Sequence, residues 1–238
     1  MKSAVNACCL AWHTKSCLQK SFMTVKKNPA SGGTREKILK AASRLFADHG
    51  YDGCSLREIA DHAKVNVGMI HYFFGTKQML LREAFVQSGA SLAIKRLELL
   101  DKAEAAVGDS LLSVDAIVDM FLRPAVDLAR TGRAGRAFLK MQARMQLEQS
   151  KLGRELRAEI YDGSSLRYVN ALMKALPAIS NKEIYWRFIF MLGTYQYVLA
   201  DTGRLEVISN KSCSSDNFDD ALREMVTFLS AGFKGTHG

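Results

Sequence analysis

The sequence predicts an all-α protein, and three observations carry this prediction. Apolar residues recur at the i, i+3, i+4, i+7 spacing of core-facing helices along most of the chain. No stretch alternates apolar and polar residues in the way that a half-buried strand does. Only 3 prolines occur in 238 residues, which leaves room for long helices.

The composition argues against several classes of protein. Apolar residues make up 48% of the chain, yet no apolar run approaches the ~20 residues that span a bilayer, so we expect no membrane segment. The 5 cysteines lack the paired CxxC spacing of a zinc site. We therefore expect free thiols in the reducing cytoplasm, with no metal and no cofactor. No phosphate-binding loop, HExxH motif or Ser/His/Asp signature indicates an enzyme.

Residues 1–33 form a basic tail that we expect to be disordered. They carry five lysines and no acidic residue, so most of the formal net charge of +9 comes from this segment. Its apolar run contains Asn6 and ends in His13 and Lys15, which makes a poor secretory signal. The composition also resembles that of an organellar transit peptide. Our preferred hypothesis is that translation starts at Met23, which mass spectrometry of the natively expressed protein would test.

Two helices are predicted at the start of the ordered chain. The first begins at Thr34, places a stripe of apolar residues on one side, and meets Gly50 where a C-terminal cap belongs. Ser55 and Glu58 then form an S-x-x-E capping box. This box predicts that the second helix starts at Leu56.

The segment KVNVGMIHYFFGTK, residues 64–77, predicts a tight turn and another short helix. Asn66 is a good N-cap for this third helix, and Thr76 caps a fourth helix that runs to about Ala103. Two short helices joined by a three- or four-residue turn make a helix-turn-helix. In that motif the second helix enters the major groove of DNA.

The third helix carries side chains that suit contact with DNA. Gly68 lets the helix N-terminus press close to a phosphate or a base edge, and Met69 can touch a thymine methyl group. His71 and Tyr72 project rings with polar tips. We expect Val65, Ile70 and Phe74 to point inward and to hold the helix on its neighbours. A plain helical bundle is the alternative, in which Ser55 only caps and Tyr72 only packs.

Residues 34–85 closely resemble the DNA-binding domain of TetR-family transcriptional regulators. The family pattern is F-x-x-x-G-[YF], then S/T-hydrophobic-x-x-I-A, then V-S-x-G-x-[IL]-Y-x-x-F and a capped lysine. These elements correspond here to residues 46–51, 55–60, 65–74 and 76–77. The chain departs from the pattern at Asn66, where serine is common, and at His71, where tyrosine is usual. The latter leaves open how the phosphate contact of the tyrosine hydroxyl is supplied.

The resemblance implies roles for individual residues. Ser55 and Lys77 would grip phosphates, Arg57 would reach a guanine edge, and Tyr72 would contact the DNA backbone. Readout would lean on apolar contact and DNA shape. The candidate DNA-binding residues are Ser55, Arg57, Asn66, Val67, Gly68, Met69, His71, Tyr72, Thr76 and Lys77.

Residues 86–238 are predicted to form a second, helical domain for ligand binding and dimerisation. Pro124 is expected to kink or break one helix, and Ser180 with Glu183 forms a second capping box. The predicted helices cover 114–130, 135–150, 152–176, 184–201 and 216–233.

The segment from Tyr185 to Leu199 is apolar on nearly every side, which predicts burial on every side. We expect one face on its own core and another on a second subunit, where Gly193 permits close approach. With the final helix it would form a four-helix dimer bundle. This agrees with how TetR-family proteins dimerise, and a two-fold homodimer would read a palindromic operator.

Methionines and aromatic residues in this domain could line a ligand cavity, although plain core is an equal alternative at each position. The domain loosely resembles the subgroup of regulators that respond to fatty acids or their CoA thioesters. The candidate lining residues are Met120, Phe121, Phe138, Met141, Gln142, Met145, Tyr168, Trp186 and Phe190. The polar end of the ligand would meet Arg144, Gln142, Gln146, Arg187 or Tyr195.

The functional hypothesis is a ligand-responsive, dimeric repressor that a small apolar effector releases from double-stranded DNA. Two other classes remain open. One is a helical carrier or enzyme of acyl compounds that does not bind DNA. The other is a structural DNA-binding protein without a ligand switch. The sequence leaves activation open beside repression.

Overall fold

The computed structural model describes residues 32–200 and 202–235. The predicted basic tail covers residues 1–33. Residues 1–31 of it, including the proposed start at Met23, lie outside the described residues. The described part is helical, as predicted. Its elements are α2 Gly32–His49, α3 Leu56–Ala63, α4 Val67–Phe74, α5 Lys77–Val107, α6 Val114–Arg130, α7 Arg133–Leu147, α8 Lys151–Arg157, the π-helical turn η3 Ala158–Asp162, α9 Gly163–Ala175, α10 Asn181–Leu199, α11 Arg204–Ile208 and α12 Phe218–Lys234.

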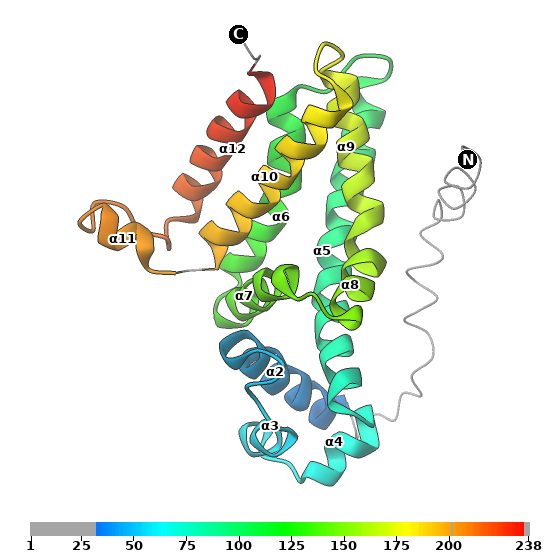
Figure 1. The fold of residues 1–238 in the computed structure, drawn as a ribbon, viewed down its shortest axis with the longest axis vertical. Helices are drawn as coiled ribbons and strands as arrows, with labels where there is room; N and C mark the ends of the chain where they lie inside the picture. Colours follow the sequence, from blue (N-terminus) through cyan, green and yellow to red (C-terminus); the bar gives the residue numbers. More distant parts are fainter. Residues whose placement is uncertain (1–31, 201, 236–238) are drawn as a thin grey trace.

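The helices form a small lower unit and a larger upper bundle that share α5 (Figure 1). Helices α2, α3 and α4 surround the start of α5, which then continues upward beside α6 and α9. Helix α7 packs against α2 from above, while α10, at the front of this view, packs against α12 on the left. No helix in the described ranges is long and apolar enough to cross a membrane.

The predicted helix starts are confirmed where a side chain caps the first turn. Ser55 Oγ accepts a hydrogen bond from the Glu58 N–H at 3.1 Å, and Asn66 Oδ1 accepts from the Gly68 N–H at 2.7 Å. Thr76 Oγ1 accepts from the Met79 N–H at 3.1 Å. These caps are local, because donor and acceptor lie two or three residues apart. Sequence spacing is therefore enough to predict them.

Several boundaries differ from the predictions. Helix α2 begins at Gly32 instead of Thr34, and α5 extends to Val107. Helix α6 continues through Pro124, which sits buried inside it, so the proline is no break. The loss of one backbone hydrogen bond is tolerated because neighbouring apolar side chains hold the helix on both sides.

Two further features have no sequence prediction. The helix expected at 152–176 is interrupted by the π-helical turn η3, which inserts one residue into the helical register. The short helix α11 lies between α10 and α12.

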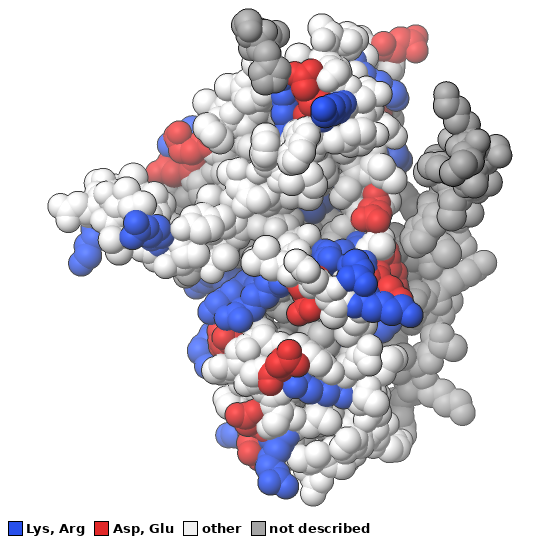
Figure 2. All heavy atoms as spheres, in the orientation of Figure 1, with Lys and Arg blue, Asp and Glu red and all other residues white. Residues whose placement is uncertain are grey.

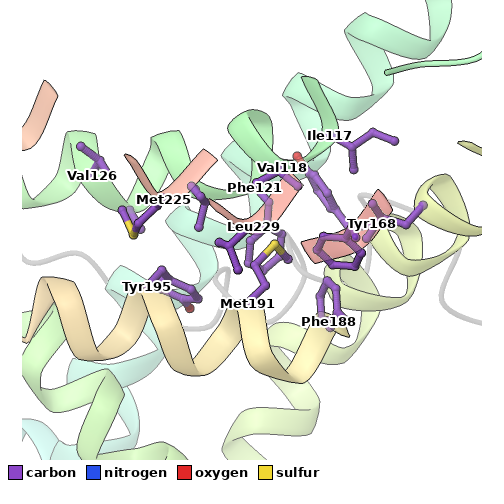
Figure 3. Close-up of a cluster of buried hydrophobic side chains, with 14 of the residues drawn as sticks. Ile117, Val118, Phe121, Val126, Tyr168, Phe188, Met191, Tyr195, Met225 and Leu229 are labelled. Atoms are coloured by element: carbon purple, nitrogen blue, oxygen red, sulfur yellow. The ribbon is translucent and has the colours of Figure 1, made fainter. Parts of the chain in front are cut away.

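Two hydrophobic cores hold the molecule together. The upper core gathers aromatic and aliphatic side chains from α5, α6, α9, α10 and α12, with Phe121 at its centre (Figure 3). The rings of Tyr168, Phe188 and Tyr195 lie 5.0, 5.3 and 5.9 Å from that of Phe121. The lower core joins α2–α5 to α7, α8 and η3.

The predicted domain boundary between residues 85 and 86 falls inside α5. Phe85 packs against Phe138 and Tyr161, whose ring centroids both lie 6.0 Å away. The lower core therefore includes side chains that come from the C-terminal segment. Because this core is closely packed, a displacement of α7 or η3 would also displace the helices around α4.

Candidate nucleic-acid interface

Helices α3 and α4 form a helix-turn-helix. Lys64 ends α3 in the left-handed conformation (φ 55°), and its N–H points back to the last turn of the helix. Asn66 then opens α4 after a three-residue turn. The inner face of the pair is buried through Ile59, Ala60 and Ile70. Phe74 is also buried and Val65 is half-buried, so the predicted inward set is largely confirmed.

The opposite face of α4 is open to solvent. Tyr72 is 78% exposed and Met69 is 36% exposed, and Gly68 and His71 lie beside them on the same surface. Arg57 is exposed at the start of the neighbouring α3. Val67 and Lys77 are half-buried. The structure thus brings the predicted DNA-binding residues together at one end of the molecule, with lysine, arginine and acidic side chains over α3 (Figure 2).

Gly68 has a second structural reason to be glycine. A Cβ built on it would lie 3.2 Å from Asn66 Oδ1, the atom that caps α4. A larger residue would crowd this cap. The open helix N-terminus and the intact cap therefore both depend on the same position.

Ser55 already has a partner. Its hydroxyl donates to Glu58 Oε2 at 2.9 Å, while its backbone N–H donates to the same oxygen at 2.6 Å. These hydrogen bonds hold the pKa of Glu58 below its ordinary value. A phosphate at this helix end would have to share the Ser55 hydroxyl with a carboxylate. The phosphate contact of Ser55 stays a prediction.

The His71 ring has a defined orientation. Its Nδ1 lies 2.8 Å from the carbonyl oxygen of Gly75. A carbonyl oxygen only accepts, so Nδ1 carries the proton in this contact, and the residue is exposed.

Lys77 is held over an aromatic ring. Its Nζ lies 4.4 Å from the centroid of Tyr51, which comes from the loop before α3. This contact restrains a side chain that would otherwise be mobile. It holds the ammonium group against the loop between α2 and α3, and the phosphate contact of Lys77 stays a prediction.

The predicted ligand-lining residues separate into three groups. Phe121 and Tyr168 belong to the upper core, against which Met120 packs half-buried. The side chains of Phe138, Met141 and Met145 belong to the lower core. Trp186 and Phe190 are 57% and 59% exposed, with ring centroids 6.0 Å apart on the outer face of α10, so they do not line the interior.

The correction at Trp186 and Phe190 has a physical cause. Helix α10 is apolar on both faces, and periodicity alone does not say which face meets the protein's own core. The structure turns Phe188, Met191 and Tyr195 inward. It leaves a band of large apolar side chains outside: Tyr185, Trp186, Ile189, Phe190 and Tyr197. Figure 2 shows few charged groups over this helix.

A cavity of about 370 Å³ lies where the loop between α2 and α3 faces α7. Met141 and Met145 line it, as does Arg144, which was predicted to meet a ligand's polar end. Arg144 is exposed and donates to the Asp48 carbonyl oxygen at 3.0 Å. This hydrogen bond joins α7 to α2, so Arg144 helps to hold the lower unit against the upper bundle.

The fold defines a two-domain helical protein with an N-terminal helix-turn-helix. Residues 38–84 match the family described as "Bacterial regulatory proteins, tetR family", and residues 119–232 match "Tetracyclin repressor-like, C-terminal domain". The chain therefore belongs to the TetR family. Membership in a family of regulatory proteins agrees with the prediction that the chain is not an enzyme.

Curated relatives match over short segments. The transcriptional repressor NicS of Pseudomonas putida is 37% identical over 76 residues, which cover 30% of this chain and 36% of the relative. The repressor AcnR of Corynebacterium glutamicum is 31% identical over 71 residues, which cover 30% and 38%. The matched segments thus span little more than a third of these relatives.

Solved structures match over most of the chain at low identity. A TetR-family regulator from Bordetella parapertussis has a TM-score of 0.62 at 15% identity and covers 82% of this chain and 93% of its own. The regulator FadR of Bacillus subtilis, solved in complex with stearoyl-CoA, has a TM-score of 0.56 at 14% identity, with coverages of 83% and 98%. These matches establish the fold.

Proposed function

We propose that the protein is a transcriptional repressor that binds operator DNA through α3 and α4. The exposed face of α4 carries this proposal. A helix whose inner face is buried and whose outer face offers Tyr72, Met69 and His71 has the form of a groove-reading helix. Arg57 and Lys77 supply positive charge on either side of it.

The proposed active form is a homodimer built on α10 and α12. The occupant of the outer apolar band on α10 is a second copy of this chain. Phe228 on α12 is 71% exposed and extends the apolar surface onto the helix that packs against α10. Exposed apolar area of this extent indicates a partner. A two-fold dimer presents two α4 helices and would read a palindromic operator.

The proposed switch is release from DNA by a small apolar effector, a fatty acid or a related acyl compound. Helix α5 begins two residues after Gly75, the C-cap of α4, and runs for 31 residues into the upper bundle. An effector that favours a different position of α5 would change the separation of the two recognition helices. Affinity then falls, provided that the effector binds one state more tightly than the other. We place this action in the cytoplasm, where operator DNA lies.

Fluorescence anisotropy with labelled DNA from beside the protein's own gene tests the proposal. We expect tight binding to this DNA, weak binding to a scrambled duplex, and release on addition of a medium-chain fatty acid or acyl-CoA. Lys174→Ala on α9 serves as the charge control and should leave affinity unchanged. Equal affinity for both duplexes would contradict a sequence-selective repressor. Selective binding that no acyl compound alters would contradict the proposed effector class.

A further inference from the structure

A buried cation lies between the two cores. Arg96 is 2% exposed on α5, and its Nε donates to the Phe121 carbonyl oxygen at 2.8 Å. Its guanidinium lies 3.7 Å from the centroid of the Phe121 ring and 5.2 Å from that of Tyr195. Its Nη2 has no hydrogen-bond partner, and Arg96 forms no ion pair with any carboxylate of the described residues. A buried charge without a counter-charge is costly, so a built site of this kind calls for an anion.

Two other buried polar groups belong to the surroundings of Arg96, because Tyr161 interacts with both Arg96 and Gln142. Gln142 on α7 is 1% exposed, and neither its amide oxygen nor its amide nitrogen has a hydrogen-bond partner. The Tyr161 hydroxyl on η3 lies beside that amide without forming a hydrogen bond of normal geometry. Burial raises the pKa of Tyr161, and the nearby charge of Arg96 opposes this effect. Unpaired donors and acceptors this deeply buried are rare in folded proteins.

The backbone is shaped to bring these groups together. The π-helical turn η3 carries Tyr161 against α5 at Gly89, where an added Cβ would lie 2.9 Å from the Tyr161 hydroxyl. Single π turns often occur at functional sites. The Tyr168 hydroxyl donates to the Arg96 carbonyl oxygen at 2.8 Å and fixes the backbone at the cation. Five elements, α5, α6, α7, η3 and α10, thus contribute groups to this polar spot among apolar side chains.

We propose that Arg96, Gln142 and Tyr161 bind the carboxylate of an effector whose remaining body is apolar. The guanidinium supplies charge and Nη2 donates, while the Gln142 amide and the Tyr161 hydroxyl supply further donors. The aromatic rings around Arg96 exclude water and accept the apolar body. A free carboxylic acid fits this chemistry, whereas its CoA thioester lacks the carboxylate. This inference rests on the proposed function in naming the ligand as its effector.

The position of the site couples it to the DNA-binding end by two routes. Arg96 lies on α5, which begins next to α4. Gln142 lies on α7, which packs against α2. An anion that draws Arg96 and Gln142 together changes the relation between α5 and α7. The relative position of α5 and α7 determines the orientation of the lower unit with respect to the upper bundle.

Calorimetric titration of the full chain with octanoate tests the site without any DNA. Octanamide has the same chain length but no charge, and octanoyl-CoA has no carboxylate on its acyl chain. We expect octanoate to bind about ten- to hundredfold more tightly than either, because a hydrogen-bonded charge pair is lost in both. Equal binding of octanoate and octanamide, or no binding of octanoate, would overturn the proposal.

Variants locate the binding. Arg96→Met keeps an unbranched apolar stem and removes the charge, and such replacements of buried ions are often neutral or stabilising. We expect it to abolish the preference for octanoate over octanamide, while Lys95→Met, an exposed cation on the same helix, keeps it. Gln142→Leu should weaken octanoate binding and provides a second variant if Arg96→Met does not fold. Unchanged octanoate affinity in both variants would overturn the assignment.

DNA binding is measured separately, so the two proposals fail independently. If octanoate binding depends on Arg96 but the protein does not bind DNA selectively, the proposed repressor function is contradicted and the carboxylate site is supported. Selective DNA binding in a protein that does not bind octanoate would do the reverse.

Discussion

Two helices expose aromatic side chains, and their surroundings differ. On α4, Tyr72 stands on an eight-residue helix with Arg57 and Lys77 on the adjoining helices. On α10, the exposed rings form a band along a 19-residue helix, and the one arginine there, Arg187, turns aside to pair with Glu183 and the Phe233 carbonyl. Aromatic exposure alone does not identify a partner. We expect the charge beside it to distinguish a surface that binds DNA from one that binds protein.

The largest expected effect is on the α10 band. The double variant Trp186→Glu and Phe190→Glu should give a folded monomer, because both side chains point away from the protein's own core. Losing the second half-site contact should weaken operator binding by about a hundredfold or more. Light scattering and anisotropy measure the two effects. Leu111→Glu, which changes an exposed apolar residue in a loop, is the control, and a double variant that remains dimeric would disprove this interface.

Arg57→Ala should loosen specificity. A bidentate contact to guanine is worth ~1–3 kcal/mol of discrimination, so we expect one position per half-site to lose its base preference. Binding to a set of operators with single base changes measures this. A uniform loss of affinity over all the operators would instead make Arg57 a phosphate contact.

Lys77→Ala should weaken binding evenly across sequences. One phosphate contact fewer per protomer lowers the slope of log affinity against log salt by about one for each half-site. The measurement is a salt series of anisotropy titrations beside Lys174→Ala. An unchanged slope would mean that the contact with Tyr51 keeps the ammonium group away from DNA.

The smallest effect concerns the capping box of α3. Hydrogen bonds from Ser55 lower the pKa of Glu58 below its ordinary value of 4.5. The carboxylate therefore stabilises the fold above that pH, and this contribution is lost as the pH falls through the lowered pKa. Glu58→Gln should reduce the melting temperature slightly at neutral pH and hardly at all well below pH 4.5. Glu98→Gln, on an exposed part of α5, is the comparison, and an equal reduction at both pH values would contradict the role of the charge.

The two regions also differ in how far the sequence predicts them. Around α4, Ser55, Asn66 and Thr76 cap helices by contacts within three residues, so their spacing alone predicts the motif. Around α10, the choice of face depends on packing against α6, α7 and α12, which lie far apart in the sequence. Trp186 and Phe190 were consequently assigned to the wrong side.

Of the three residues of the buried polar site, the sequence predicts Gln142 as a ligand contact, whereas Arg96 and Tyr161 are missed for a related reason. Arg96 lies in the same helical stripe as the apolar residues Leu92 and Leu100, and this position is the one sequence feature that indicates its burial. An arginine at such a position is normally interpreted as a surface residue of which only the aliphatic part is buried. Tyr161 depends on a π turn, which shifts the register by one residue and leaves no pattern in the sequence.

The outward band on α10 has a genetic consequence. If two copies join through it, a gene copy that carries a damaged α4 but an intact α10 yields subunits that still associate with normal ones. Each mixed dimer contains a single functional α4 helix and cannot bind both halves of an operator. Such an allele would therefore act dominantly over the wild type in a cell that contains both, whereas an allele damaged at Trp186 and Phe190 would be recessive.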